Sequence, residues 1–280
     1  MKIVTAQQIT DCVKQMCMNA NYDLGKDMIE AFDQSLFTET SISGQTVLKI
    51  LRENAEISAS ERVAICQDTG FAVIFVDLGQ EVQIIGGSFE EAIHEGVRQG
   101  YQEGYLRKSI VKDPLDRVNT KDNTPAVIHV SIVPGERLKI VMMAKGGGCE
   151  NMSRLAMLKP SQGWEGVRDF VIETAKLAGP NACPPIIVGV GIGGTFEKSA
   201  LLAKHSLLRP IGSKNPRSDL QKLEEELMTA INKLGIGPQG YGGNTTTLAV
   251  HVQAYPCHIA SLPVAVNIEC HAHRHKEVIL

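Results

Sequence analysis

The stretch PPIIVGVGIGG, residues 184–194, is a run of apolar residues that ends in glycines. Short apolar runs bounded by turn signals are typical of buried strands. A helical pattern follows from about residue 196 to 208, so this part of the chain is predicted to form a strand, a glycine-rich loop and a helix. Gly189, Gly191 and Gly194 also have the G-x-G-x-x-G spacing of a dinucleotide-binding turn.

The glycine spacing alone does not make a dinucleotide site. Such a site needs a second parallel strand that ends in an acidic residue about 20 positions after the glycines. Residues 209–218, RPIGSKNPRS, instead have turn chemistry, and a helical pattern follows them. We therefore expect no NAD. Two interpretations of the glycines stay open: close packing of the strand against the helix, or backbone N–H groups that face an anion.

The first sixty residues have the pattern of helices. Thr5 and Gln8 form a capping-box signature, and apolar residues from Ile9 to Ala20 follow the i, i+3, i+4, i+7 spacing of one helix face. Two further helical patterns are centred near Phe32 and Ile50. The sequence therefore predicts an N-terminal helical cap over residues 1–60.

Strand patterns dominate after the cap. Three apolar runs predict strands, namely VAICQ (63–67), FAVIFVDLG (71–79) and VQIIGG (82–87). Ser88 and Glu91 then open a capped helix that extends to about Leu106. The segment PAVIHVSIVPGERLKIVMMAKGGG, residues 125–148, predicts a hairpin of two strands around Pro134-Gly135.

The rest of the chain mixes helices and strands. Helices are predicted over residues 164–178 and over SDLQKLEEELMTAINKLG (218–235), with Ser218 as the cap. Two final strands are predicted near residues 247–253 and 264–269. We expect an α/β (mixed α+β) fold, in which residues 61–280 form one composite core of a mixed sheet with flanking helices.

Composition excludes several classes of protein. The 280-residue chain has a net charge of −3, which disfavours nucleic acid or an anionic membrane as its partner. Its start lacks the apolar core of a signal peptide, and no apolar run is long enough for a membrane span. We therefore expect a cytoplasmic protein with a small-molecule or protein partner.

The chain has seven cysteines, an odd number that argues against a disulfide framework. Cys12 and Cys17 lie on the apolar face of the first predicted helix, so we expect them to pack in the core. Cys66, Cys183 and Cys270 instead lie where predicted strands meet loops. Their wide separation in the chain excludes zinc-ribbon and ferredoxin signatures, which cluster their ligands.

Three distant thiolates have a chemical consequence if the fold gathers them. Soft thiolates select zinc or iron–sulfur clusters. A set of three would leave one iron of a [4Fe–4S] cluster without a protein ligand, and such an iron can act as a Lewis acid on a substrate oxygen. Spacing alone leaves ordinary buried thiols as the alternative.

The residues around these thiols resemble a known family, from about residue 40 onward. Five ordered blocks closely resemble the α subunit of the class I, iron–sulfur-dependent fumarate hydratases, a group that includes L-tartrate dehydratase. The blocks are CQDTG (66–70), KGGGCENMS (145–153), NACPPIIVGVGIGGTFEKSALLAKHSLLRP (181–210), GIGPQGYGGNTTTLAVH (235–251) and HIASLPVAVNIECHAHRH (258–275).

The resemblance implies a set of cluster ligands. Matched by block, Cys66, Cys183 and Cys270 would hold a [4Fe–4S] cluster with one iron not ligated by protein. Many relatives have Ser at the position of Cys149, so Cys149 is expected to be a substitution and not a fourth ligand. Cys257 lies outside the ligand motifs and is expected to be structural.

The resemblance also implies residues that contact a small dicarboxylate substrate. Gln67, Arg107 and Gly147 match substrate-binding positions, and Asp68 and His258 match catalytic positions. Arg107 would bind a carboxylate with two hydrogen bonds. Asp68 would transfer a proton or orient a hydroxyl group, and His258 would bind a carboxylate or shuttle a proton.

Each of these residues also has an ordinary structural interpretation. Asp68 begins a good turn, Arg107 could be a solvated helix end, and His258 could be a buried imidazole. The alternating histidines near the C-terminus, at residues 271, 273 and 275, suggest a metal tract, but we expect the last residues to be frayed or at a subunit contact.

The implied reaction is the hydration of fumarate to L-malate, a reversible step of the tricarboxylic acid cycle. L-Tartrate dehydratase and a non-catalytic iron–sulfur sensor are the alternatives. Longer single-chain relatives carry a second domain that this sequence lacks. The resemblance therefore implies a separate β subunit, in an α2β2 assembly, that completes the site.

Overall fold

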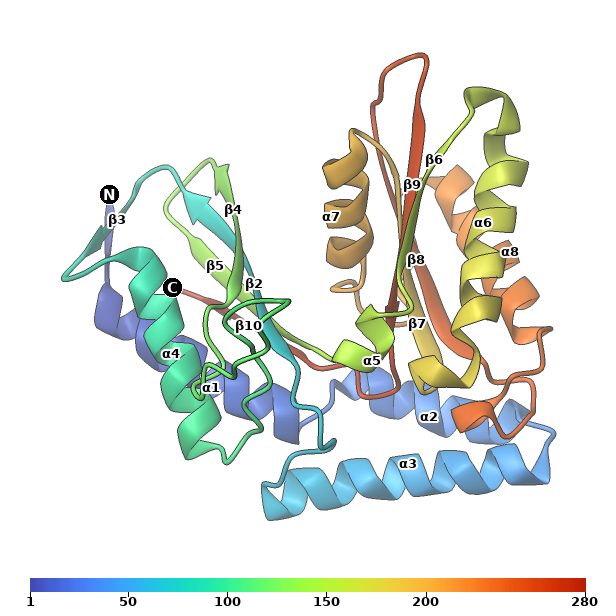
Figure 1. Ribbon diagram of the computed structural model, residues 1–280, viewed down its shortest axis with the longest axis horizontal. Helices are drawn as coiled ribbons and strands as arrows, with labels where there is room; N and C mark the ends of the chain where they lie inside the picture. The colour runs from blue at the N-terminus through green and yellow to red at the C-terminus, as the bar shows by residue number, and fades with distance from the viewer. The chain divides into compact units, whose positions relative to one another are not determined.

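The computed structural model describes residues 1–280 and forms two compact units. Both units contain strands and helices, which confirms the mixed α/β class (Figure 1). The division into a helical subdomain over residues 1–60 and a core over residues 61–280 stays a prediction. The segments of unit 1 are Met1–Gly25, Asn54–Gly147 and Arg274–Leu280, and those of unit 2 are Lys26–Glu53 and Gly148–His273.

Unit 1 is built around a four-stranded sheet with the strand order β10-β5-β2-β4 (Figure 1). The apolar run of β2 is almost wholly buried, so β2 takes a central place, parallel to β4 and antiparallel to β5. Helix α1 packs against α4 and against β5 and β10. The elements of unit 1 are β1 (Lys2–Thr5), α1 (Ala6–Tyr22), β2 (Phe71–Gly79), β3 (Val82–Ile85), α4 (Phe89–Glu103), β4 (Val127–Val133), β5 (Leu138–Lys145) and β10 (His275–Ile279).

Unit 2 has a second four-stranded sheet, with the order β6-β9-β7-β8. β7 is parallel to β8 and antiparallel to β9. Helix α7 covers one face of this sheet, and α6 and α8 cover the other (Figure 1). The main elements are α2 (Lys26–Thr38), α5 (Gly147–Glu150), β6 (Arg154–Leu158), α6 (Gly163–Ala178), β7 (Ile186–Gly193), α7 (Phe196–Ser206), α8 (Ser218–Asn232), β8 (Thr247–Tyr255) and β9 (Leu262–Glu269). Short 3-10 turns lie at Pro160–Gln162, Gly179–Ala182 and Pro238–Gly240, and helix α3 (Ile42–Glu61) includes residues of both units.

The glycines of the quoted stretch allow β7 to pack closely against α7. A Cβ atom on Gly189 would lie 2.1 Å from the carbonyl oxygen of Ala203, and one on Gly191 would lie 2.1 Å from that of Ser199. These distances are far below van der Waals contact, so no larger residue fits at either position. At these two glycines, close packing of strand against helix is the role that the structure confirms.

Two of the three predicted helix caps are confirmed, and the third is wrong by one residue. Thr5 and Gln8 form the predicted capping box at the start of α1, and Ser88 caps α4. Ser218 is the first residue of α8, and Arg217 takes the N-cap position that was expected for Ser218.

The predicted hairpin over residues 125–148 is wrong. β4 and β5 do not pair with each other, because β2 lies between them and pairs with both. The predicted strand at VAICQ is also wrong. There the N–H of Ile65 donates to the carbonyl of Asn21, and the Asn54 amide donates to the carbonyl of Ile65, so other segments satisfy this backbone.

Three strands were not predicted from the sequence, namely β1, β6 and β10. β10 pairs with β5 along its whole length, from His275 to Ile279, so the last residues are not frayed, which was one of the two alternatives expected for them. All three strands are only four or five residues long, which leaves too few residues for a clear alternation of apolar and polar side chains.

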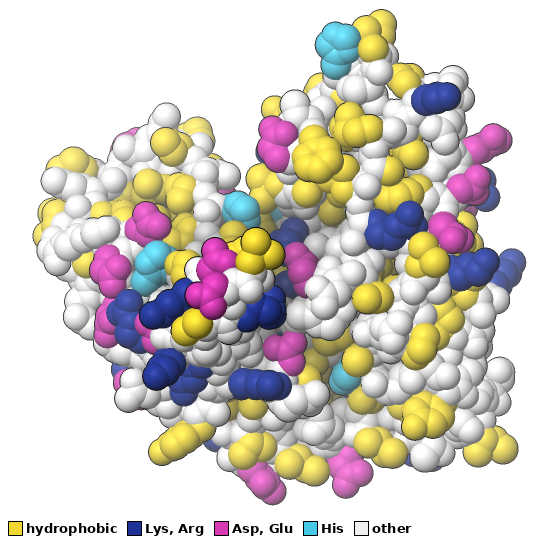
Figure 2. All heavy atoms as spheres, viewed as in Figure 1, with side chains coloured by type: hydrophobic (Ala, Val, Ile, Leu, Met, Phe, Trp, Pro, Cys, Tyr) yellow, Lys and Arg dark blue, Asp and Glu magenta, His cyan; other side chains and the backbone are white.

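The surface agrees with the composition. Lys and Arg side chains are interspersed with Asp and Glu on the face drawn in Figure 2, so this face offers no continuous basic area for a phosphate backbone. None of the helices combines the length and the apolar character needed to cross a bilayer.

Candidate active site

The turn after α3 carries three predicted site residues of unit 1. The half-buried Cys66 thiol donates to Oε1 of Gln67 over 3.6 Å, and Gln67 is exposed. Asp68 accepts a hydrogen bond at Oδ1 from the N–H of Gly70 (3.0 Å) and another at Oδ2 from the N–H of Gly147 (2.8 Å). Asp68 therefore holds the cysteine turn against the glycine loop, and the N–H of Gly147 already has a partner.

Arg107 lies near the same turn through its backbone. Its carbonyl oxygen accepts from Oγ1 of Thr69 over 3.0 Å, and the Tyr101 hydroxyl donates to the carbonyl of Thr69 over 2.7 Å. The side chain of Arg107 is exposed and makes no ion pair within the chain. Its guanidinium group is therefore free to bind a carboxylate from outside.

Arg274 supports this turn, although it was not predicted. It is 1% exposed, and its Nη1 donates to the carbonyl of Asp68 (2.6 Å) and to Oδ1 of Asn21 (3.1 Å). These two contacts of the buried guanidinium group fix the position of the backbone at Asp68. The only signal in the sequence was an arginine within HAHRH, a segment that had been interpreted through its histidines.

Unit 2 brings Cys183 and Cys270 to the same end of two neighbouring central strands. Cys183 lies just before β7 and Cys270 directly after β9, and these strands are antiparallel neighbours. The carbonyl oxygen of Cys183 accepts from the N–H of His271 (3.3 Å) and lies 3.1 Å from its Nδ1. Cys183 has a left-handed backbone with φ of 52°, which ends the preceding 3-10 turn. The two cysteine loops are thus hydrogen-bonded to each other.

Cys149 lies beside Cys270, with a buried carboxylate between them. The donor atoms of Cys149, Glu269 and Cys270 all lie within 4.8 Å of one another, and the Cys149 thiol donates to Oε1 of Glu269 over 3.5 Å. Glu269 is fully buried and was not predicted, although an acidic residue at the end of an apolar strand was a signal. Thiols and a carboxylate in a buried setting suit a transition metal or an iron–sulfur group. Within unit 2, these three donors therefore form a group that could hold a metal ion or an iron–sulfur group.

His258 lies at the opposite end of the strands of unit 2. It belongs to the loop between β8 and β9, and the eight residues of β9 separate this loop from Cys270. At ~3.3 Å per residue, that strand spans roughly 25 Å. The His258 imidazole is exposed and accepts at Nδ1 from the N–H of Ala260 over 3.1 Å. Within one chain, the structure does not bring His258 to Cys183 and Cys270.

The other three cysteines, Cys12, Cys17 and Cys257, differ in their burial. Cys17 is fully buried in the core of unit 1, which raises the pKa of its thiol, whereas Cys12 is only half-buried. The Cys257 thiol is exposed and donates to the carbonyl of Ser261 over 3.3 Å. His273 is 1% exposed, so the alternating histidines do not form an open metal tract on the surface.

A mixed α/β chain in which two thiols and a buried carboxylate lie close together is suited to a metal-dependent enzyme, and comparison with known proteins specifies the class. Residues 10–279 match the family described as fumarate hydratase (Fumerase). The chain belongs to this family and is a hydro-lyase.

Its relatives match over almost their full length. A Methanocaldococcus jannaschii protein, provisionally named L(+)-tartrate dehydratase subunit alpha, is 40% identical over 275 residues, which cover 95% of each chain. The L(+)-tartrate dehydratase subunit alpha of Escherichia coli K12 is 33% identical over 271 residues, 95% of this chain and 89% of its own. The protein of the same name from Shigella sonnei has the same identity and coverage.

Proposed function

We propose that this chain is the α subunit of a [4Fe–4S]-dependent hydro-lyase that interconverts fumarate and L-malate. The family match over residues 10–279 carries the proposal, because it covers all the residues implied by the resemblance. The geometry within each unit supports it: hydrogen bonds fix Asp68 in the Cys66 turn, and Cys183 and Cys270 lie at the same end of two neighbouring strands.

Cys66, Cys183 and Cys270 would hold the cluster. When bound, a cluster with one iron not ligated by protein supplies a Lewis acid for the hydroxyl group that leaves or adds. Cys149 stays outside this ligand set in the proposal, although its thiol lies beside Glu269 and Cys270. Its hydrogen bond to Glu269 gives it a structural role.

The substrate would be bound and oriented by residues of unit 1. Arg107 has no acidic partner in the chain, so a dicarboxylate can form a bidentate contact with it. Asp68 keeps its carboxylate fixed through the N–H groups of Gly70 and Gly147, and from that position it would orient the hydroxyl group or move its proton. The exposed amide of Gln67 would complete the polar contacts.

A separate β subunit would supply the base that removes the C3 proton, in an α2β2 assembly. The names of the relatives describe alpha subunits, which supports a partner of this kind. His258 would join a site only from a second copy of the chain, because in its own chain it lies at the opposite end of β9 from Cys270. Its neighbour Ile259 is 92% exposed and Trp164 of the same pocket is 52% exposed, so this end of unit 2 is suited to contact another chain.

L-Tartrate dehydratase is the second candidate, and the names of the relatives favour it. L-Tartrate differs from L-malate by one hydroxyl group, so the same residues could serve either substrate. The ratio of kcat/KM for L-malate and L-tartrate, measured with both subunits present, decides between them. A ratio well above one supports the fumarate reaction, and a ratio well below one overturns it in favour of tartrate.

The cluster itself is tested by anaerobic reconstitution. Wild type should bind about four irons and four sulfides per chain, and Cys183→Ala should lose them. Cys149→Ser is the matched control, because it changes a neighbouring thiol that the proposal excludes as a ligand, and it should retain the cluster. Loss of the cluster in Cys149→Ser would overturn the ligand set. Cluster binding without hydro-lyase activity in the assembled enzyme would favour an iron–sulfur sensor, and stable activity after prolonged aeration would contradict an iron exposed to small molecules.

A further inference from the structure

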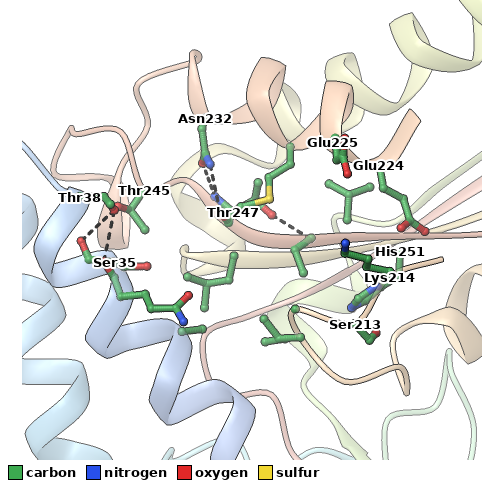
Figure 3. A pocket seen from close by; sticks show the side chains of 18 of the residues that line it. Ser35, Thr38, Ser213, Lys214, Glu224, Glu225, Asn232, Thr245, Thr247 and His251 are labelled. Carbon is green, nitrogen blue, oxygen red and sulfur yellow. Dashed lines mark hydrogen bonds between the residues drawn. The ribbon is translucent and has the colours of Figure 1, made fainter. Parts of the chain in front are cut away.

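Unit 2 contains a pocket of about 480 Å³ that none of the predicted site residues lines (Figure 3). Its volume is in the range of small-molecule sites. One face of α2 borders it, from Ala31 to Thr38, and residues of α8, β8 and the loop 211–214 form the rest. In Figure 3, Glu224 and Glu225 lie on one side of the strand, and Ser213, Lys214 and His251 lie together on the other.

His251 is the unusual member of this lining. It is 2% exposed, and neither of its ring nitrogens has a hydrogen-bond partner. Burial, together with nearby Arg209 and His273, lowers the pKa of His251 to about 3, so the ring is neutral at ordinary pH. A neutral imidazole has one N–H donor and one acceptor nitrogen, and leaving both unpaired in the interior is costly. A bound polar group would remove that cost.

The open edge of β8 adds a backbone donor. β8 is the last strand of its sheet, and Val252 directs its N–H and carbonyl away from β7, to Glu224 and Asn215. Val250, two residues earlier, directs its backbone to the same edge because alternate residues of a strand share a direction. Glu224 thus shows how a carboxylate sits on this edge: its Oε1 accepts the N–H of Val252 over 2.7 Å.

An unpaired lysine at the rim of the pocket favours an anion. Arg209 and His273 lower the pKa of His251, and only Asp27 acts in the opposite direction. Glu224 is already bonded to Arg209, Asn215 and the N–H of Val252, and Glu225 accepts from Gln221. Lys214 is exposed at the rim and makes no ion pair. Among the charged side chains that line the pocket, Lys214 is therefore the one without a partner in the chain.

The remaining wall selects an aliphatic body. Ile211, Met228 and Leu248 line the pocket, and no Phe, Tyr or Trp does, so an aromatic ring would find nothing to stack on except His251. We propose that this pocket binds a small aliphatic carboxylate. Its carboxylate lies among the His251 ring, the Val250 N–H and the Lys214 ammonium group, and its chain packs on the apolar wall. The site is independent of the proposed reaction.

Calorimetric titration of the 280-residue chain with hexanoate tests the proposal, with hexan-1-ol as the uncharged probe. Hexanoate should bind in the millimolar range or tighter, and hexan-1-ol about tenfold more weakly or worse. Lys214→Ala should weaken hexanoate binding about tenfold, whereas Lys222→Ala, an exposed lysine of α8 outside the pocket, should change it by less than about twofold.

NMR signals of the His251 ring provide a second measurement that requires no change at a buried position. They should shift on addition of hexanoate, and those of His94 in unit 1 should not. Equal binding of hexanoate and hexan-1-ol, unchanged binding in Lys214→Ala, or no shift of the His251 signals would each overturn the proposal.

Discussion

The variant Asp68→Asn tests whether Asp68 has a catalytic role or only stabilises the turn in which it lies. Asp68 accepts the N–H of Gly70 at 3.0 Å with one oxygen and the N–H of Gly147 at 2.8 Å with the other. Asparagine has a single oxygen, so its NH₂ group must face one of these two donors. Losing one charge-assisted hydrogen bond should lower the free energy of unfolding by about 2 kcal/mol.

The effect on activity should be much larger than this loss of stability. An amide cannot accept or return a proton, and positioned proton transfer contributes roughly 100-fold or more to a rate. We therefore expect kcat for fumarate hydration, in the enzyme assembled with its β subunit, to fall at least about 100-fold. Urea unfolding of the same preparation gives the stability.

Asp113→Asn is the matched control in unit 1. Asp113 also accepts two backbone N–H groups, those of Leu115 and Asp116, each over 2.8 Å, but both bind its Oδ1 and it lies on an exposed loop, so it controls for the change from carboxylate to amide alone. Its replacement should leave kcat unchanged. If kcat of Asp68→Asn stays within about tenfold of wild type while its stability falls, Asp68 only forms a turn and the catalytic assignment is refuted.

Three further predictions concern the two units. Glu39 is 2% exposed, and burial alone would raise its pKa, but hydrogen bonds from Ser41, Thr245 and Asn244 outweigh burial and lower the pKa below 4.5. The stability that the Glu39 carboxylate provides is therefore complete above that pH and is lost as the pH falls through the lowered pKa. Urea unfolding should therefore show a smaller loss of stability between about pH 7 and pH 4 in Glu39→Gln than in wild type, and equal losses would contradict this. Gly189→Ala should lower the free energy of unfolding by about 3 kcal/mol, because its Cβ would lie 2.1 Å from the Ala203 carbonyl oxygen. A decrease of less than about 1 kcal/mol would show that β7 can move away from α7. Random pairing of His258→Ala with Cys183→Ala chains should restore about a quarter of wild-type activity if His258 serves the site of a second copy, whereas no recovery would exclude that arrangement.

Elements with strong local signals were predictable. The capping residues Thr5 and Ser88 fix helix starts through hydrogen bonds within a single turn, and the apolar runs of β2 and β7 are long enough to mark buried strands. Short β1, β6 and β10 carried too little pattern. The hairpin failed because proximity in sequence suggested that β4 pairs with β5, while β2, more than forty residues earlier in the chain, inserts between them.

In the candidate site, too, some residues could be predicted from the sequence and others could not. The motifs around Cys66, Cys183 and Cys270 predict which residues carry chemistry, because unusual polar residues beside apolar runs are visible in a sequence, and this assignment stays a prediction. The supporting contacts were not visible. Arg274 beneath Asp68, and Glu269 between Cys149 and Cys270, depend on partners far away in the chain.

By itself, then, the sequence determined the mixed α/β class, most helices and the family, since periodicity, caps and ordered motifs are local properties. Only the tertiary structure decided the order of the strands, the placement of Cys183 and Cys270 at the same strand ends, the distance of His258 from them and the lack of a hydrogen-bond partner for the His251 ring. Each of these is set by which distant surfaces bury one another, and the free energy of that burial belongs to pairs of segments that no single stretch of sequence contains.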